Sequence, residues 1–558
     1  MPRSPRSTLY AALLAAVASV GGLALVALRR WRGAAHPLPE EAPAMAENTN
    51  AAALPAVVED VKIPPATRDV EKSTIKQTAA LSIGRIAAAL AGIGCLAGAQ
   101  APLLGSRHPA VPLLLFIAGG LLLQPMYLYY ERCWLHEDAP QVDTGVSAAP
   151  GSTRPRALYW AGWLFFAAVC VVLRQIGVGG MLLIFCWLMS VAALLYAALN
   201  GQPLLPSTRF SHWQALAQAR RAEIIGVLAL TLIAAFVQLF TPSLPQTTLA
   251  GCALAVLIVP AAYLCGRQFG GIMTGFYAAG LAVVSGWALA LGKAGGLYAG
   301  LAVASALYLL ALHHIRRSQQ RVGYIWAGLA VGAGTLILPA FGYSLLLLLL
   351  MWLGQRPYRV RGIGQVIVAV LLVLTVSLPA LPLPPVGGVS PTPTNEAVPP
   401  NPQTSLAESL PTTLLLLNLS SDPNPLHGIV YRPALSPVEV AAFLTGLMGI
   451  AWRIYASHNW REALLPLALV ALALPSAVVA DVPVRYPDLQ RAAGMLPAAL
   501  VIAAMGMNWT LGLFEARWRK AGKVAFAVVF AAALVIVLAG WQQHYHQQVL
   551  PLLVTGAF

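Results

Sequence analysis

The chain has 558 residues, of which 58% are hydrophobic and 10% are charged, and its mean hydropathy is +0.72. Soluble domains carry about 25% charged residues, so this composition excludes a soluble globular protein. The formal net charge of +15 does not indicate nucleic-acid binding, because the Lys and Arg residues form short clusters between apolar stretches. Such clusters are typical of the cytoplasmic loops of membrane proteins, where they orient the chain.

Long apolar stretches recur along the chain. A helix needs about 20 apolar residues to cross a bilayer, and by this measure the sequence predicts about sixteen transmembrane helices. They cover residues 10–28, 79–99, 110–129, 157–173, 178–198, 223–241, 247–265, 271–290, 295–313, 323–339, 342–354, 364–382, 436–453, 463–480, 492–513 and 523–541. Because only helices satisfy their backbone hydrogen bonds in lipid at these lengths, the predicted fold is an all-α polytopic integral membrane protein without a large soluble domain.

The polar segments between these helices divide the chain into units. The basic start and the long apolar run of residues 1–33 are similar to an uncleaved signal anchor. Pro- and Ala-rich segments without apolar periodicity are typical of flexible linkers. The predicted units are 1–33 as the first span, 34–78 as a flexible linker, 79–198 as an N-terminal transmembrane unit with a polar linker at 131–156, 199–222 as an amphipathic cytoplasmic segment, 223–541 as the main transmembrane unit, and 542–558 as an external tail.

The long loop 383–435 within the main unit sets the expected orientation. No Lys or Arg occurs from Gly362 to Tyr431, whereas cytoplasmic loops carry an excess of both residues. We therefore expect this loop outside the membrane. Counting helices back from the loop places Arg267 inside and the short loop Thr241–Thr247 outside.

Acidic residues are nearly absent from the apolar region. Glu223 is the only one between Thr144 and Asn395. A charged group in hydrocarbon costs roughly 2.5–3.5 kcal/mol, so an acid retained within a transmembrane helix usually has a function. The sequence offers almost no such group to a transport mechanism.

No residue pattern indicates a cofactor or a divalent metal. The six cysteines have no metal-ligand spacing and lie mostly within apolar runs, where a free Cys behaves as a small hydrophobic residue. His544, Tyr545 and His546 form a cluster near the C-terminus, but no carboxylate or Cys accompanies them. Because a zinc site needs such additional ligands, a solvated tail is the favoured interpretation.

Several segments between residues 220 and 540 combine Gly, Pro, aromatic and basic residues. They are Leu249–Gly270, Ser285-Gly286-Trp287, Lys293-Ala294-Gly295, Pro339-Ala340-Phe341-Gly342-Tyr343, Asn418-Leu419-Ser420-Ser421-Asp422-Pro423-Asn424-Pro425-Leu426-His427 with Arg432-Pro433, and Pro487–Pro497. In this order they resemble bacterial GT-C glycosyltransferases related to the dolichyl-phosphate-mannose protein mannosyltransferases. The resemblance implies a GT-C-like helical core over 223–541 in a bacterial-type cytoplasmic membrane.

The resemblance also implies a reaction at the external membrane face. In this family a polyprenyl-phosphate carrier presents the sugar, an acid in the first external loop acts as the general base, and basic side chains hold the lipid phosphate. Here the corresponding loop, Thr241–Thr247, has no acid and is short. Its Ser, Thr and Gln residues cannot replace a carboxylate, because they do not accept a proton near neutral pH. Asp422 and Asp481 are the candidate substitutes.

The remaining candidates lie at the predicted external ends of helices or in external loops. They are Lys293, Arg485 and Arg491 for the lipid phosphate, and His427 and Arg432 in the external loop. Each type of residue also has a structural interpretation. Lys293 can be an interfacial anchor, an Asp before Pro can cap its own turn, and the two Arg residues near Asp481 and Asp488 can form local ion pairs.

Three functions therefore remain open. The first is an active transferase of lipid-linked sugar whose base has moved. The second is a relative without catalytic activity, which binds a polyprenyl lipid or serves as a structural subunit of a membrane complex. The third is a transporter, which the shortage of ionisable groups in the apolar helices disfavours. The expected partners are membrane lipid, a polyprenyl-phosphate sugar and another membrane protein.

Overall fold

The computed structural model describes residues 83–98, 114–115, 118–124, 126–127, 156–175, 180–199, 220–244, 247–293, 296–318, 321–354, 359–380, 406–417, 433–457, 463–478, 488–517 and 521–555. Within these ranges the chain forms helices joined by turns, and it forms no β-strand. The structure is therefore a helical bundle, as the apolar composition requires.

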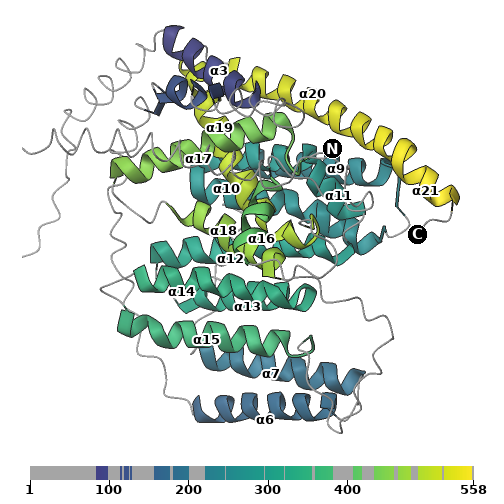
Figure 1. Ribbon diagram of the computed structural model, residues 1–558. Coiled ribbons are helices and arrows are strands. Elements are labelled where there is room, and N and C mark those ends of the chain that lie inside the picture. The colour runs from purple at the N-terminus through teal and green to yellow at the C-terminus, as the bar shows by residue number, and fades with distance from the viewer. Residues whose placement is uncertain are drawn as a thin grey trace, which may run out of the picture.

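The helices on one side of the bundle are stacked one beside the next (Figure 1). In order of packing they are α6 (Arg156–Gln175), α7 (Met181–Leu199), α15 (Arg359–Ser377), α13 (Arg321–Ile337) and α12 (Ala299–Ser318), with α14 (Leu345–Gly354) against α15. Two tryptophan side chains and one arginine side chain connect these helices. Trp163 Nε1 donates to Thr375 Oγ1 at 2.9 Å, Trp187 Nε1 donates to the Thr375 carbonyl at 3.1 Å, and Arg174 donates to the Leu378 carbonyl.

The other helices form the centre of the bundle and its remaining faces. They are α9 (Arg221–Phe240), α10 (Leu249–Val284), α11 (Gly286–Lys293), α16 (Leu406–Leu415), α17 (Pro437–Ser457), α18 (Leu464–Val478) and α19 (Leu496–Arg517), with α3 (Ile83–Gly98), α20 (Ala521–His544) and α21 (Leu550–Thr555) on the periphery. Helix α19 is the central element, since 83% of its apolar window is buried. It crosses α17 so closely that a Cβ atom on Gly446 or Gly506 would overlap the facing backbone. Small residues permit such contacts between helices in lipid.

Helix α10 is an antiparallel hairpin with a further break. Gly271 adopts φ 86° and ψ −178°, a backbone conformation that favours glycine. The two arms then pack through small residues, because a Cβ atom on Gly266 would lie 2.8 Å from the Thr274 carbonyl oxygen. The second arm ends at Ser285, whose extended backbone separates it from α11. The predicted spans 247–265 and 271–290 correspond to these two arms.

Among the described residues, seven helices are long and apolar enough to cross a membrane, which makes the protein a helical membrane protein by length and composition. One of the seven is the 36-residue segment Leu249–Val284, which contains the hairpin. Further apolar helices, including α13, α18 and the part Ile363–Ser377 of α15, have between 10 and 17 residues. The predicted count of about sixteen spans is not confirmed on this criterion, and the first predicted span, 10–28, lies outside the described residues.

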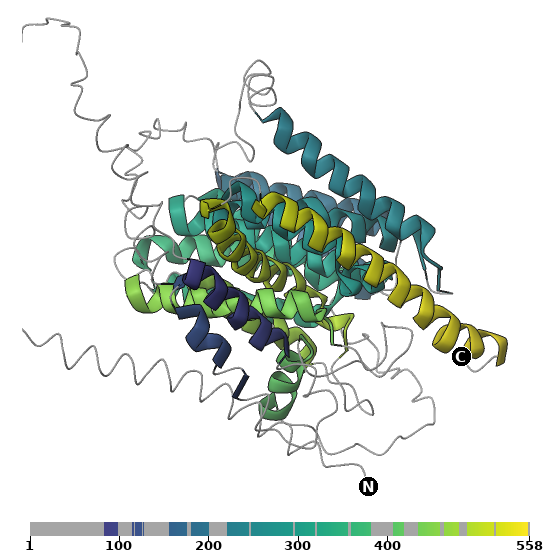
Figure 2. The same ribbon diagram turned by 90° about the horizontal axis from the view of Figure 1, so that it is seen from above.

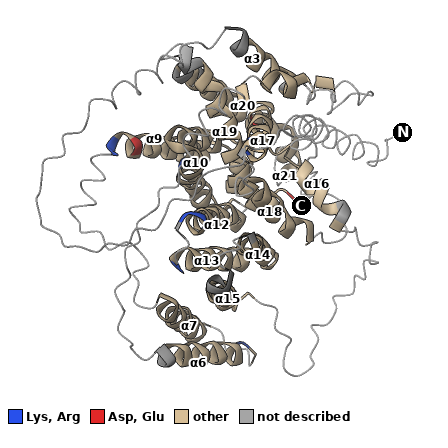
Figure 3. Ribbon diagram, turned by 90° about the vertical axis from the view of Figure 1, so that its left-hand side faces the viewer, with Lys and Arg blue, Asp and Glu red and all other residues tan. Residues whose placement is uncertain are grey.

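Basic residues gather at one end of the bundle, which we call the basic end. Helices α9 and α13 begin there with Arg221 and Arg321, and α12 ends there with Arg316 and Arg317. Figure 3 shows these blue helix ends facing the viewer together. The first turn of α9 also carries the acidic residue Glu223 at this end. That the basic end faces the cytoplasm stays a prediction from the distribution of Lys and Arg.

Glu223 is neutralised within the basic end. Its Oε2 atom lies 3.4 Å from Arg267 Nη1 and accepts a hydrogen bond from the Tyr263 hydroxyl at 2.8 Å. Both partners come from the first arm of α10, so the pair ties α9 to the hairpin. The one acid of the long apolar region is therefore a structural residue at a helix start.

The C-terminal segment differs from its prediction as a solvated tail over 542–558. Helix α20 continues through a π-helical turn at Tyr545–Val549 into α21, which ends at Thr555. The apolar window extends over Phe526–Val554, and Figure 2 shows this segment in yellow as a long rod across the bundle. In this helix His544 and Val549 are 3% and 0% exposed, so the interpretation as a solvated tail fails at these positions, whereas the external location of 542–558 stays a prediction.

Candidate functional site

Lys293 closes the end of α9. Its side chain is 1% exposed, and Nζ donates to the Thr241 carbonyl at 2.9 Å and to the Gln238 carbonyl. The carbonyls in the last turn of a helix lack helical partners. The Gln238 carbonyl lacks a helical partner for an additional reason: the residue four positions later is Pro242, which has no N–H to donate. Lys293 therefore supplies both the hydrogen bonds and the positive charge that a helix C-terminus favours.

Further contacts fix the described residues of the short loop, 241–244 and 247. Thr247 Oγ1 donates to the Lys293 carbonyl at 2.7 Å and accepts from Leu244 N at 2.8 Å. On the other side of the loop, Trp541 Nε1 donates to the Pro242 carbonyl at 3.4 Å. The described residues of this loop, 241–244 and 247, are thus bound to α11 and α20.

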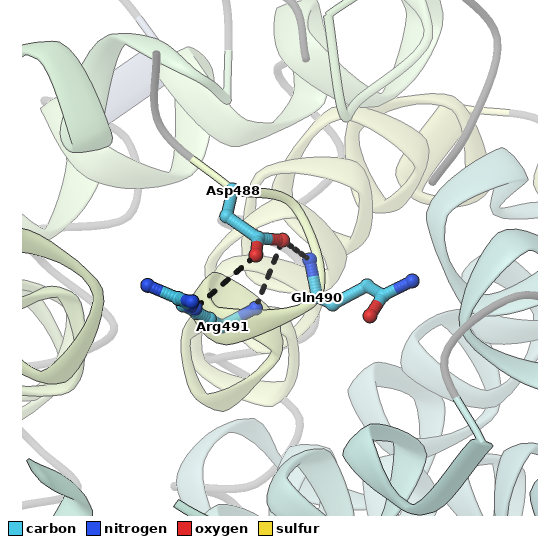
Figure 4. A network of polar contacts seen from close by, with 3 residues as sticks. All are labelled: Asp488, Gln490 and Arg491. Atoms are coloured by element: carbon cyan, nitrogen blue, oxygen red, sulfur yellow. Dashed lines mark hydrogen bonds and ion pairs between the residues drawn. The ribbon is translucent and has the colours of Figure 1, made fainter. Parts of the chain in front are cut away.

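Arg491 and Asp488 form a local pair at the start of α19 (Figure 4). Asp488 Oδ1 accepts from Gln490 N at 2.7 Å and from Arg491 N at 3.4 Å, which caps the 3-10 turn η5 (Arg491–Met495). The Arg491 Nε atom lies 3.3 Å from Asp488 Oδ2, and the two side chains are 25% and 24% exposed. A partly exposed pair of this kind contributes about 0–1 kcal/mol, so the guanidinium group can exchange partners at low cost.

Three of the segments that carry the family resemblance meet in the fold. Trp287 of α11 donates from Nε1 to the Leu489 carbonyl at 3.0 Å, across 202 residues of sequence. Gly494 lies against the ring of Phe341, since a Cβ atom on Gly494 would be 3.0 Å from that ring. The segments around Trp287, Phe341 and Leu489 thus form one packed unit. It lies at the end of the bundle opposite the basic end, which we call the opposite end.

The remaining site candidates fall outside the described residues. They are Asp422, Asp481, Arg485, His427 and Arg432. The proposed replacements for the general base are therefore not placed relative to Lys293 and Arg491. Part of the surrounding loop is placed, because Ser409 of α16 donates to the Ala477 carbonyl at 2.8 Å. This bond holds α16 against the end of α18.

The histidines near the C-terminus bond along their own helix. His544 is 3% exposed and its Nδ1 lies 2.7 Å from Gln548 Oε1, while His546 Nε2 lies 3.1 Å from Gln542 Nε2. Within the described ranges, no group of three His, Cys, Asp or Glu side chains could hold a metal ion. The interpretation of this cluster as solvated fails for His544, which packs on the ring of Trp541.

Sequence reasoning missed Glu439, a carboxyl group buried in the centre of the bundle. Its side chain is 1% exposed, and Oε2 accepts from Ser436 N at 2.7 Å. In return Ser436 Oγ accepts from Glu439 N at 3.4 Å. The sequence Ser-Pro-Val-Glu at 436–439 is the signal that could have revealed it, because Ser, Pro at the next position and Glu three residues after Ser are typical of a helix N-terminus.

A comparison of the chain with protein-family models, with characterised proteins and with solved structures finds no match. The assignment of a function therefore rests on the residues and their geometry.

Replacement of Lys293 tests its structural role. We expect Lys293→Met to lower the free energy of unfolding by about 1–3 kcal/mol, because it leaves buried carbonyls of α9 without donors. Arg491→Gln is the matched control, with an expected loss of about 0–1 kcal/mol. Thermal unfolding in detergent measures both. Equal melting temperatures for Lys293→Met and the unchanged protein would contradict the role.

Proposed function

We propose that the protein is a GT-C-like membrane protein that binds a polyprenyl-phosphate-linked sugar at the external membrane face. The observation that carries the proposal is the meeting of the segments around Trp287, Phe341 and Leu489 at the opposite end of the bundle. Segments that are far apart in a sequence and resemble the same family should form one unit if the resemblance reflects a common core. The proposal retains about sixteen spans, of which the apolar helices of 10–17 residues would supply the shorter ones.

Arg491 is the residue that we assign to the lipid phosphate. Its guanidinium group is partly exposed, and so is the carboxylate of Asp488 with which it forms an ion pair. A phosphate group offers Arg a stronger bidentate partner than a single local carboxylate. Lys293 has a different role in this proposal, because its ammonium group is buried and bonded to two carbonyls. It positions α11, and through Trp287 of that helix it supports the turn that carries Arg491.

The contacts of the loop 241–247 favour a second candidate, a relative without catalytic activity. The loop has no acidic residue and is bound on both sides by Lys293 and Trp541. Such a protein would bind the lipid-linked sugar, or pack against an active membrane protein, without transferring the sugar. The two candidates share the binding step and differ in turnover.

Binding of a polyprenyl-phosphate analogue tests the shared step. In nanodiscs we expect Arg491→Gln to weaken binding about 10- to 100-fold, because a hydrogen bond to a charged group contributes about 1.5–3 kcal/mol. Arg491→Lys should retain part of the affinity. Arg317→Gln, at the basic end, is the matched control and should bind normally. If Arg491→Gln and Arg317→Gln bind equally well, the site does not include Arg491.

Sugar transfer separates the two candidates. Loss of a positioned general base typically lowers the rate by about 10²–10⁴. We therefore expect the purified protein to transfer sugar from a polyprenyl-phosphate donor no faster than a membrane preparation without it. Clear turnover would show that another base acts, and Asp422→Asn and Asp481→Asn would then be compared. The variant that removes turnover while the donor still binds would identify that base.

A further inference from the structure

Helices α6 and α7 form an antiparallel hairpin, and Figure 1 shows α6 at the edge of the stack. The contact between Tyr159 and Tyr196 fixes the register of the two helices, because their ring centroids are 4.2 Å apart. Tyr159 stands 16 residues before the end of α6, and Tyr196 stands 15 residues after the start of α7. Residues at equal distances from the connection 176–180 therefore lie at the same level of the hairpin.

Two cysteines occupy such a level. Cys170 stands five residues before the end of α6, and Cys186 stands five residues after the start of α7. At about 1.5 Å per residue, each lies about 7.5 Å along its helix from the connection. We call these two residues the cysteine pair.

Both members of the cysteine pair face the interior of the hairpin. Cys170 is 1% exposed and Cys186 is 5% exposed, and both belong with Leu378 to one buried cluster. The two thiols are close enough to interact electrostatically. Facing Cα atoms of two helices whose axes are about 8–10 Å apart come within about 5 Å of each other. A disulfide joins Cα atoms about 4.4–6.8 Å apart, so cysteines at one level of adjoining helices meet its requirement.

The other cysteines among the described residues have different surroundings. Cys252 and Cys265 lie on the same arm of α10, thirteen residues or about 20 Å apart. Their thiols donate to backbone carbonyls, that of Cys252 to Gly292 at 3.5 Å and that of Cys265 to Ala306 at 3.2 Å. Cys95 lies on α3, which packs against α17 and α19. Among the described cysteines, the pair in the hairpin is therefore the one that is placed for a bond.

The cysteine pair lies near the opposite end of the bundle. Helix α15 runs parallel to α13, because a Cβ atom on Gly328 would meet Ala369 and one on Gly332 would meet Val376. Since α13 begins at the basic end, α15 ends at the opposite end. Arg174, in the last turn of α6, donates to a carbonyl just beyond the end of α15, so the connection of the hairpin is at this end too. In the predicted orientation this end faces outward, where the environment of a bacterial-type membrane is oxidising.

We propose that Cys170 and Cys186 form a disulfide that cross-links α6 and α7 near the opposite end. The structure contains both residues as thiols, the form that precedes the bond. The proposal rests on the predicted orientation and is independent of the proposed lipid-phosphate site. A cross-link has a physical reason here, because α6 packs mainly against α7. Apolar helices have no hydrophobic driving force toward each other in lipid, so a helix at the edge gains most from a covalent bond.

The order of synthesis gives the oxidant access to the cysteine pair. In the folded structure the pair is buried together with Leu378, which follows α15. Residues 156–199 precede 359–378 in the chain. The hairpin therefore enters the membrane before α15 does, and at that stage α15 does not cover the thiols.

The bond forms by thiol–disulfide exchange with a compound that carries an exposed disulfide at the external face. The Cys170 thiolate attacks that disulfide, which gives a mixed disulfide and releases one thiol of the oxidant. The Cys186 thiolate then attacks the Cys170 sulfur and releases the second thiol. The oxidant is reduced to a dithiol by two electrons, and it takes up the two protons that the cysteines lose.

Peptide mapping without a reductant tests the proposal on the full-length protein. Cells that produce the protein are quenched with acid, and N-ethylmaleimide then blocks every thiol during denaturation, so that no exchange occurs during isolation. Trypsin cleaves after Arg174 and separates the two cysteines. We expect the peptides 157–174 and 175–209 to be joined, with two hydrogen atoms fewer than the separate peptides together. Cys252 and Cys265 are internal controls that should carry the maleimide.

Two variants and one treatment complete the experiment. In Cys186→Ser, Cys170 should carry the maleimide, whereas Cys252→Ser should leave the joined peptides unchanged. Dithiothreitol present during synthesis should give the maleimide on both members of the pair, which shows that the mapping detects the reduced form. The proposal is overturned if both cysteines carry the maleimide in untreated cells, or if either is bonded to a different cysteine.

Discussion

The absence of water from the apolar region is the constraint on which the rest of the structure depends. Every break in a helix there must find hydrogen-bond partners within the protein. The α10–α11 segment contains such a break at Ser285, and its far end adjoins the last turn of α9. Ser285 Oγ accepts from Ala288 N at 3.4 Å, and Lys293 bonds the free carbonyls of α9. These bonds set the position of Trp287, and through it the position of the turn that begins α19.

The same constraint explains how the few charged groups are used. Glu223 is paired with Arg267, Asp488 with Arg491, and Lys293 with backbone carbonyls. Of these, the Asp488–Arg491 pair is at the opposite end and partly exposed, so it can exchange its partner for a phosphate group. Glu439 differs from these residues, because it is buried and its Oε2 atom accepts from the backbone N–H of Ser436.

Local patterns in the sequence predicted where helices lie, but they did not predict the contacts between residues that are far apart in the sequence. The apolar stretches 247–265 and 271–290 predicted the two arms of α10, which the turn at Gly271 joins. The role of Lys293 could not be predicted, because it depends on a partner more than 50 residues away, at Gln238. Glu439 was also missed. Its local sequence indicates the start of a helix, but its burial depends on the distant helices α10, α19 and α20. The helical C-terminal segment was missed because exposed Gln residues separate the buried positions Trp541, His544 and Val549 in the sequence.

Labelling from outside the cell tests most directly whether the opposite end faces outward, as a site for an externally presented lipid-linked sugar requires. A cysteine at Ser405, next to α16, would be introduced into a chain whose six native cysteines are replaced. The account predicts reaction with a membrane-impermeant thiol reagent in intact cells, while a cysteine at Ser318, at the basic end, reacts only after lysis. The reverse pattern would invert the bundle and contradict the account.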